Sequence, residues 1–164
     1  MLKMKVAHIM VFMLASSAGF AQMAETVKHI QTDKAAIASG VWVGNTYYLS
    51  GTMPNAITAA DAAKGTPAVY GDTKTQTFSS LSKIQASLKE QGLTMGDVVL
   101  MHVYMAGDPA NGGKLDFAGM NSSYSEFFGT KDQPNKPARS AMQVAALVAP
   151  GALVEIEVVA VKQK

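Results

Sequence analysis

"KPARSAMQVAALVAPGALVEIEVVAV", residues 136–161, consists almost entirely of small and apolar side chains. Two strand-like parts, 138–147 and 153–162, flank an Ala-Pro-Gly turn at 149–151, a composition typical of two strands joined by a turn. Three charged side chains interrupt the apolar pattern: Arg139, Glu155 and Glu157. The sequence therefore predicts two largely buried strands whose few charges need an explanation.

The arginine is the only one in the chain, beside thirteen lysines. A guanidinium group binds a carboxylate through two parallel hydrogen bonds and keeps its charge at any physiological pH. The ammonium of lysine lacks this planar two-pronged geometry. Arg139 is therefore a candidate carboxylate-binding residue. The alternative is a structural ion pair of Arg139 with Glu155 or Glu157.

Strand geometry separates the arginine from both glutamates. Side chains alternate along a strand, so Arg139 and Ala141 share one face of the first strand, and the two glutamates share one face of the second. In a simple hairpin turning at Pro150, Glu155 would lie about six residues, or roughly 20 Å, from Arg139. Either another strand lies between these two strands, or charges of different subunits meet.

Further strand patterns precede this stretch. Residues 26–30 have the composition of a short strand, and 40–51 that of a hairpin turning at the Gly-Asn pair 44–45, which is suited to positive φ. The apolar run 97–107 predicts a strand covered on both faces. The stretch 52–73 mixes Pro, Gly, Ala and Asp without a period, and we expect a long loop with a short helical turn.

Two segments have helical periodicity, 72–92 and 114–129, and each ends in a glycine. The apolar positions that we expect to face the core are Phe78, Leu81, Ile84, Ala86 and Leu88 in the first segment, and Phe117, Met120, Tyr124 and Phe127 or Phe128 in the second. The order of strands and helices favours an α+β fold, a mostly antiparallel sheet with two helices on one face.

The N-terminus has the pattern of a secretory signal peptide. Two lysines precede an apolar run over 6–14, and small residues lead up to Ala21. We expect cleavage of residues 1–21, a periplasmic or secreted location without a membrane contact, and a single domain over 22–164. An N-terminal membrane anchor is the alternative, but the apolar run is short for a membrane span.

Composition excludes several classes of function. Loss of the two lysines in 1–21 lowers the formal net charge from +2 to zero, which argues against a nucleic-acid partner. The absence of cysteine excludes disulfides, thiolate nucleophiles and Cys-ligated metals. His29 and His102 stand in strand-like runs without a second metal ligand at a suitable spacing, so we expect packed or hydrogen-bonded histidines and no metal site. No phosphate-binding or dinucleotide motif indicates a cofactor.

The C-terminal stretch resembles the signature of the reactive-intermediate deaminase family (Rid, YjgF or UK114-like). In that signature a Pro-Ala-Arg-Ser stretch precedes a Val/Ile-Glu-Ile-Glu strand. Three further segments are similar to the family: "VGNTYYLSG" (43–51), "TQTFSSLSKIQASLKEQGLTMGDVV" (75–99) and "MNSSYSEFFG" (120–129). The resemblance covers about residues 26–162. It implies a chorismate-mutase-like α+β domain that forms homotrimers with clefts between the subunits.

The resemblance also implies an activity, the hydrolysis of small 2-imino acids to 2-oxo acids and ammonia without a metal or an organic cofactor. The family's carboxylate-binding arginine falls on Arg139, and its water-positioning glutamate falls on Glu155, with one extra residue between them. Its cysteine falls on Ala141, where only the backbone can bind the substrate. Its helical asparagine falls on Asn121, otherwise a simple surface residue, and Glu157 is expected to be structural.

The chain departs from the family at several places. The tyrosine that lines the family's site falls on Ile37, within "AAIASG" (35–40), so an aromatic hydroxyl is lost. The loops 52–73 and 107–114 also differ and are expected to reshape the cleft. These departures and the predicted export leave two alternatives open: a non-catalytic protein that binds a small carboxylate, and a holdase-like interaction protein.

Overall fold

The fold is taken from a computed structural model that describes residues 26–163. The strands are β1 (Val27–Ile30), β2 (Gly40–Val43), β3 (Thr46–Thr52), β4 (Val98–Met105), β5 (Ala138–Gln143) and β6 (Val154–Val161). The helices are α1 (Thr73–Glu90) and α2 (Phe117–Phe127), with short 3-10 turns at η1 (Met95–Asp97) and η2 (Pro109–Asn111). This order confirms the predicted sequence of strands and helices. The predicted signal peptide lies outside the described residues.

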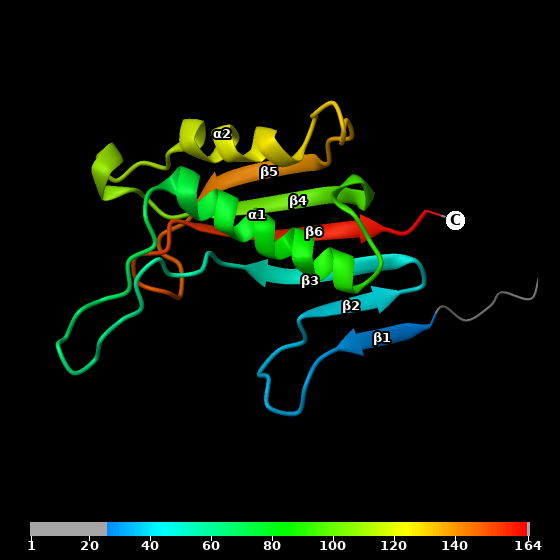
Figure 1. The fold of residues 1–164 in the computed structure, drawn as a ribbon, viewed down its shortest axis with the longest axis horizontal. Helices are drawn as coiled ribbons and strands as arrows, with labels where there is room; N and C mark the ends of the chain where they lie inside the picture. Colours follow the sequence, from blue (N-terminus) through cyan, green and yellow to red (C-terminus); the bar gives the residue numbers. More distant parts are fainter. Residues whose placement is uncertain (1–25, 164) are drawn as a thin grey trace, which may run out of the picture.

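The strands form one sheet in the order β1-β2-β3-β6-β4-β5 (Figure 1). All neighbours are antiparallel except β4 and β5, which are parallel. The exception follows from the connection, because α2 lies between β4 and β5 in the chain and carries it back to the starting end of the sheet. The predicted α+β fold with a mostly antiparallel sheet is confirmed.

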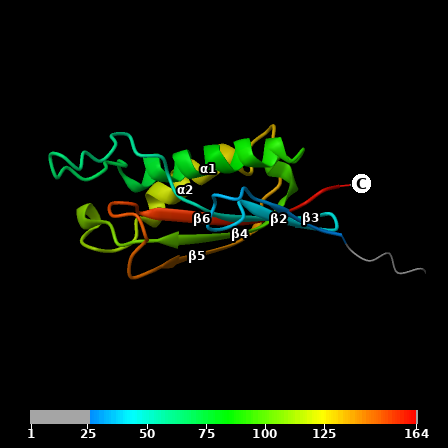
Figure 2. The ribbon, with the colours of Figure 1, turned by 90° about the horizontal axis from the view of Figure 1, so that it is seen from below.

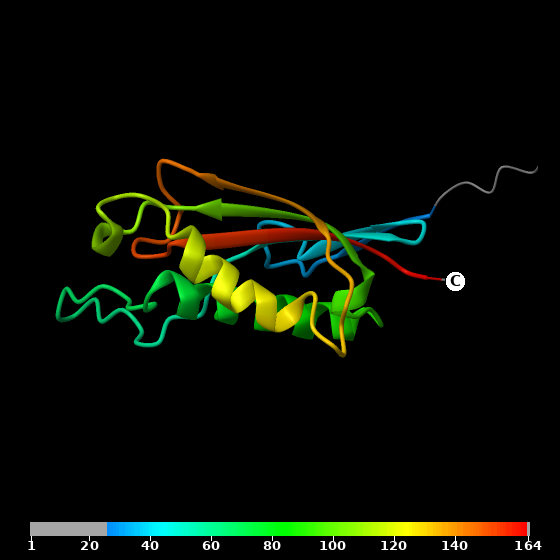
Figure 3. The same ribbon diagram turned by 90° about the horizontal axis from the view of Figure 1, so that it is seen from above.

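Both helices cover the same face of the sheet (Figures 2 and 3). Alternate residues of β4 and β6 point into the core beneath them, and every one of these is buried: Met101, Val103, Met105, Val154, Ile156, Val158 and Ala160. Leu81, Ile84 and Leu88 of α1 and Met120 of α2 complete this core. Alternate residues of the strands thus pack against the residues that repeat with the helical period on α1 and α2.

The opposite face of the sheet has no helix on it. The expectation that β4 is covered on both faces is therefore wrong for the single chain: Val99 is 44% exposed, and His102 and Tyr104 are half-buried. Tyr48 and Met142 are exposed on the same face of β3 and β5. We call this surface the helix-free face.

Helix α1 begins and ends close to the predicted residues, and Leu81, Ile84 and Leu88 face the core as expected, but the rest of its buried face differs. Asp72 caps it by accepting a hydrogen bond from the Thr75 N–H at 2.8 Å. Phe78 and Ala86, which we expected to face the core, are exposed, and polar residues such as Gln76 are buried instead. The Gln76 side chain donates to Gly71 O and Gly151 O and accepts from Leu153 N–H, so its burial leaves no polar atom unpaired.

The turns agree with the predictions only in part. The β2–β3 hairpin turns at Gly44 and Asn45 as predicted, with φ of 58° at Gly44, but Asn45 does not adopt positive φ. Strand β5 ends at Gln143 and not at residue 147, because residues 144–153 leave the sheet as a loop.

Residues 53–72, between β3 and α1, form the long loop that we expected, but without a helix. They form an irregular hairpin with isolated bridges between Thr58 and Val69 and between Asp61 and Thr66. The Asp61 carboxylate accepts hydrogen bonds from two backbone N–H groups in the turn, which closes it locally. The hairpin projects beyond the end of the sheet (Figure 1).

Candidate functional site

Arg139 and Glu155 lie on strands that are separated by β4, as one of the two alternatives from the sequence required. Arg139 pairs with Met101 of β4, and Glu155 pairs with Tyr104. Paired residues point to the same face, and an odd spacing along a strand changes the face. Arg139 therefore points towards the helices, and Glu155 points to the helix-free face.

This arrangement excludes an ion pair of Arg139 with Glu155 or Glu157 of the same chain. Glu157 shares the helix-free face with Glu155, so both carboxylates are on the other side of the sheet. The ion pairs found within residues 26–163 are Lys64–Asp61 and His102–Glu157, and neither includes Arg139. The guanidinium therefore has no carboxylate partner within the described residues.

Helix α2 holds the Arg139 side chain through neutral groups. Its Nη2 donates a 2.8 Å hydrogen bond to Asn121 Oδ1, and its Nη1 lies 3.5 Å from Met120 Sδ. The guanidinium carbon is 4.2 Å from the centroid of the Tyr124 ring and 5.7 Å from that of Phe117. We call these four residues of α2 the arginine cradle. Of the three residues predicted to bind substrate, the structure thus brings Arg139 and Asn121 together.

The third predicted residue, Ala141, lies two positions after Arg139 on the same face of β5 and packs against the core. Strand β5 is the edge of the sheet, so alternate backbone groups have no strand partner. The edge of β5 therefore offers backbone hydrogen bonds beside the guanidinium. The backbone role expected for Ala141 stays a prediction.

Tyr124 presents a neutral ring to the arginine. Burial raises the pKa of its phenol, and the positive charge of Arg139 acts in the opposite direction. The ring is also stacked on Phe128, with 4.9 Å between the centroids. The arginine cradle therefore fixes the guanidinium by a rigid aromatic face and one amide oxygen, and leaves most of its five N–H donors free.

Glu155 lies beside the end of β3 on the helix-free face. A bulge between Leu49 and Thr52 brings Gly51 against it, and a Cβ added to Gly51 would overlap Glu155 Oε1. Within residues 26–163 no hydrogen bond to the Glu155 carboxylate is found. This carboxylate is therefore available to bind a water molecule or a ligand.

Glu157 is engaged on the same face. It accepts hydrogen bonds from the Tyr104 hydroxyl at 3.0 Å and from His102 Nδ1 at 2.7 Å. The bond to Glu157 raises the pKa of the Tyr104 phenol, because it favours the protonated form. His102 is hydrogen-bonded as expected, whereas His29 is exposed and not packed. Residues 26–163 contain no group of three or more potential metal ligands.

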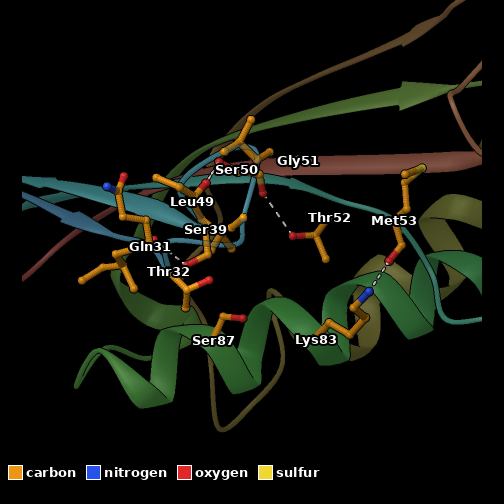
Figure 4. A pocket seen from close by; sticks show the side chains of 14 residues that line it. Gln31, Thr32, Ser39, Leu49, Ser50, Gly51, Thr52, Met53, Lys83 and Ser87 are labelled. Carbon is orange, nitrogen blue, oxygen red and sulfur yellow. Dashed lines mark hydrogen bonds between the residues drawn. The ribbon is translucent and has the colours of Figure 1, made fainter.

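A pocket of about 520 Å³ adjoins Gly51 on the helix-covered side. It lies between α1, the end of β3 and the β1–β2 loop (Figure 4). Ile37, the position of the family tyrosine, lines it and is 70% exposed. Sequence reasoning missed this pocket because its residues come from separate segments and form no motif. We call it the α1–β3 pocket.

The chain matches the family described as Endoribonuclease L-PSP over residues 34–162. A RutC family protein of Haemophilus influenzae is 34% identical over 139 residues, which cover 82% of this chain and 96% of that protein. A protein of Salmonella typhimurium named 2-iminobutanoate/2-iminopropanoate deaminase is 33% identical over 141 residues, which cover 83% of this chain and 98% of that protein.

Solved structures have the same fold. TdcF of Escherichia coli, crystallised with bound serine, superposes with a TM-score of 0.62 and 30% identity, over 83% of this chain and 99% of that one. A putative endoribonuclease of Thermotoga maritima gives a TM-score of 0.61 and 28% identity, over 84% of this chain and 98% of that one.

Proposed function

This chain belongs to the Endoribonuclease L-PSP family, also called the Rid, YjgF or RutC family, and we propose that it hydrolyses small 2-imino acids to 2-oxo acids and ammonia. The observation that carries the proposal is the unpaired Arg139 guanidinium in its cradle of neutral α2 side chains. The planar guanidinium can bind a carboxylate through two parallel hydrogen bonds. The deaminase of Salmonella typhimurium and the serine-bound TdcF support a small carboxylate-bearing ligand.

Arg139 binds the substrate carboxylate through two parallel hydrogen bonds and thereby orients the adjacent imine carbon. The edge of β5 at Ala141 adds a backbone hydrogen bond. Asn121 keeps the guanidinium in place, since it already accepts one of its N–H groups. These residues bind and orient the substrate, and a different residue positions the reacting water.

Glu155 positions that water and acts as the general base. The water oxygen adds to the carbon of the protonated imine as Glu155 takes a proton from the water, so the imine nitrogen becomes a neutral amine. Glu155 returns this proton to the amine and then accepts the hydroxyl proton as the carbon–nitrogen bond breaks, so ammonia leaves and the carbonyl of the 2-oxo acid forms. One water is consumed, and no electron is transferred, so the reaction needs no redox cofactor.

The two halves of this site require two copies of the chain. The carboxylate and the imine carbon of a 2-imino acid are adjacent atoms, whereas Arg139 and Glu155 lie on opposite faces of the sheet. We therefore propose a homotrimer with clefts between subunits, in which Arg139 of one subunit faces Glu155 of the next. The exposed apolar residues of the helix-free face, among them Tyr48, Val99 and Met142, support burial against another subunit.

A non-catalytic protein that binds small carboxylates is the second candidate. It is favoured by Ile37, which cannot supply the hydroxyl of the family tyrosine, and by Ala141, which lacks the family's thiol. The arginine cradle would serve this function unchanged. The two candidates differ only in whether Glu155 activates a water.

The charge of residues 22–164 supports a small ligand over RNA as the substrate. Their formal net charge is zero once the two lysines of 1–21 are gone, whereas binding of a phosphate backbone draws on concentrated positive charge. Arg139 is a single cation in an aromatic cradle. This arrangement fits one carboxylate and not a chain of phosphates.

We also propose that the protein acts outside the cytosol, after cleavage behind Ala21. The two lysines before the apolar run 6–14 and the small residues that lead up to Ala21 support this proposal. As a separate finding, no helix within residues 26–163 is long and apolar enough to cross a membrane. Exported material should begin at Gln22 in a mass spectrum, and an intact Met1 would contradict the proposal.

The experiment that tests the activity generates 2-iminopropanoate from alanine with an amino-acid oxidase. The purified protein should accelerate the loss of the imine. Arg139→Ala should abolish the acceleration because the carboxylate is no longer bound, and Glu155→Gln should abolish it while pyruvate still binds. Pyruvate binding without any acceleration by the wild-type protein would favour the non-catalytic candidate.

A further inference from the structure

The α1–β3 pocket has polar walls around a single charged side chain. Five hydroxyl groups line it, those of Thr32, Ser39, Ser50, Thr52 and Ser87, and Ile30, Ile37 and Leu49 supply apolar surface. Lys83 of α1 is its only charged lining residue. In Figure 4, Lys83 and Ser87 lie on the helix side of the pocket, across from Ser50 and Gly51 of β3.

Lys83 is held so that its ammonium faces this space. Its Nζ donates a 2.8 Å hydrogen bond to Met53 O, which leaves two of its three N–H donors for a ligand. No carboxylate lines the pocket, and the two ion pairs found within residues 26–163 do not involve Lys83. A partly buried ammonium without a counter-ion favours an anion beside it.

Gly51 links the lining of the pocket to Glu155, because it lines the pocket and a Cβ added to it would overlap the Glu155 carboxylate. Strand β2 begins at Gly40, which lies opposite Leu49 of β3. Just before β2, the Ser39 carbonyl accepts a hydrogen bond from Ser50 N–H of β3. Beyond this point Gly51 has no neighbour on the β2 side. It lines the pocket and also touches the Glu155 carboxylate, so a ligand can extend from Glu155 past Gly51 into the pocket.

We propose that the α1–β3 pocket receives the side chain of the substrate and that Lys83 selects 2-imino acids with an acidic side chain. This inference rests on the proposed function, because it takes the reacting carbon to lie beside Glu155. Arg139 of the neighbouring subunit then binds the carboxylate next to the imine, and Lys83 binds the second carboxylate. The hydroxyls of Ser39, Ser50 and Thr52 already donate to backbone carbonyls, so those of Thr32 and Ser87 are the ones that can donate to the same anion.

The test compares two ligands with the same five-carbon chain, 2-oxoglutarate and 2-oxopentanoate, which differ in a terminal carboxylate and a methyl group. By calorimetric titration, the wild-type protein should bind 2-oxoglutarate about tenfold to a hundredfold more tightly, the range for a charged hydrogen bond. Lys83→Met should remove this preference and leave the affinity for 2-oxopentanoate unchanged. Lys83→Arg, which keeps the charge, should retain it.

Lys74→Met is the matched control, because Lys74 is exposed on the same helix and does not line the pocket. It should leave both affinities unchanged. Thermal melts check that Lys83→Met is folded despite the lost bond to Met53. Equal wild-type affinity for the two ligands, or an equal loss of both in Lys83→Met, would overturn the inference.

Failure of the inference is distinguishable from failure of the proposed function. If the protein hydrolyses 2-iminopropanoate but shows no Lys83-dependent preference, the deaminase assignment stands and the assignment of Lys83 is wrong. If the preference is present and depends on Lys83 while no imine is hydrolysed, the pocket is a carboxylate site of a binding protein. If neither is observed, both are wrong.

Discussion

Arg139 and Glu155 extend from opposite faces of one sheet, because they pair with Met101 and Tyr104, which are three residues apart on β4. The strand between them also sets them roughly 10 Å apart across the sheet. In the proposed function, a single chain therefore offers a carboxylate-binding half-site under α2 and a water-binding half-site on the helix-free face.

Replacement of Arg139 by lysine keeps the charge and removes the two-pronged geometry. Pyruvate binding should weaken by about 1 to 3 kcal/mol, as for a lost charged hydrogen bond, and the melting temperature should change little. Calorimetric titration and thermal melts on the same samples measure both effects. An unchanged affinity together with a large drop in melting temperature would show that Arg139 is structural.

The arginine cradle predicts a contrast between two variants of Tyr124. Tyr124→Phe keeps the aromatic face at the guanidinium and should bind pyruvate as the wild type does. Tyr124→Leu removes the ring and should weaken pyruvate binding by about 0.5 to 2 kcal/mol, since the arginine is less well oriented. Equal loss in both variants would mean that the hydroxyl, and not the ring, matters.

A Cβ at Gly51 should disable the Glu155 half-site alone. Gly51→Ala places this atom against the Glu155 carboxylate, while the backbone at Gly51 is not in the left-handed region. Imine hydrolysis should fall by about tenfold or more, and pyruvate binding at Arg139 should persist. Adding Gly51→Ala to Glu155→Gln should cause no further loss. Wild-type turnover in Gly51→Ala would exclude Glu155 as the water-positioning residue.

The cap of α1 predicts a pH-dependent contribution to stability. Hydrogen bonds from the Thr75 side chain and backbone hold the pKa of Asp72 below its ordinary value of 3.8. A lowered folded-state pKa gives stability that is present above the unfolded pKa and is lost as pH falls through the folded one. Asp72→Ala should therefore cost about 1 kcal/mol in urea unfolding at pH 7.

The same variant should lose its effect in acid. Below about pH 4 the difference between Asp72→Ala and the wild type should shrink progressively, since the protonated carboxyl is a poorer acceptor. Asp72→Asn, which retains a capping oxygen, is the control and should stay close to the wild type at pH 7. A difference that is independent of pH would contradict this account.

Local patterns in the sequence predicted most of the elements. Alternation in β6 and periodicity in 72–92 identified a strand and a helix, and the parity of Arg139 and Glu155 showed that a plain hairpin was unsuitable. Local patterns could not supply the strand order. Whether β4 lies between β5 and β6 depends on packing between distant segments.

The buried face of α1 and the α1–β3 pocket show the same limit. Gln76 can be buried because its side chain is hydrogen-bonded to the backbone of Gly71 and of Leu153, and Leu153 is 77 residues away in the chain. The hydroxyl groups around Lys83 come from the β1–β2 loop, β3 and α1. Pockets of this kind arise from the topology of the fold, and no residue spacing in the sequence predicts them.

The central claim is that Arg139 of one chain and Glu155 of another act on the same substrate. Arg139→Ala and Glu155→Gln chains, each inactive alone, should regain activity when they are unfolded together and refolded as mixed assemblies. In a random equal mixture about a quarter of the clefts would combine an intact arginine with an intact glutamate, so roughly a quarter of wild-type imine hydrolysis is expected. Mixed assemblies, verified by mass, that remain as inactive as the separate variants would contradict the claim, because a site within one chain cannot be repaired by its neighbour.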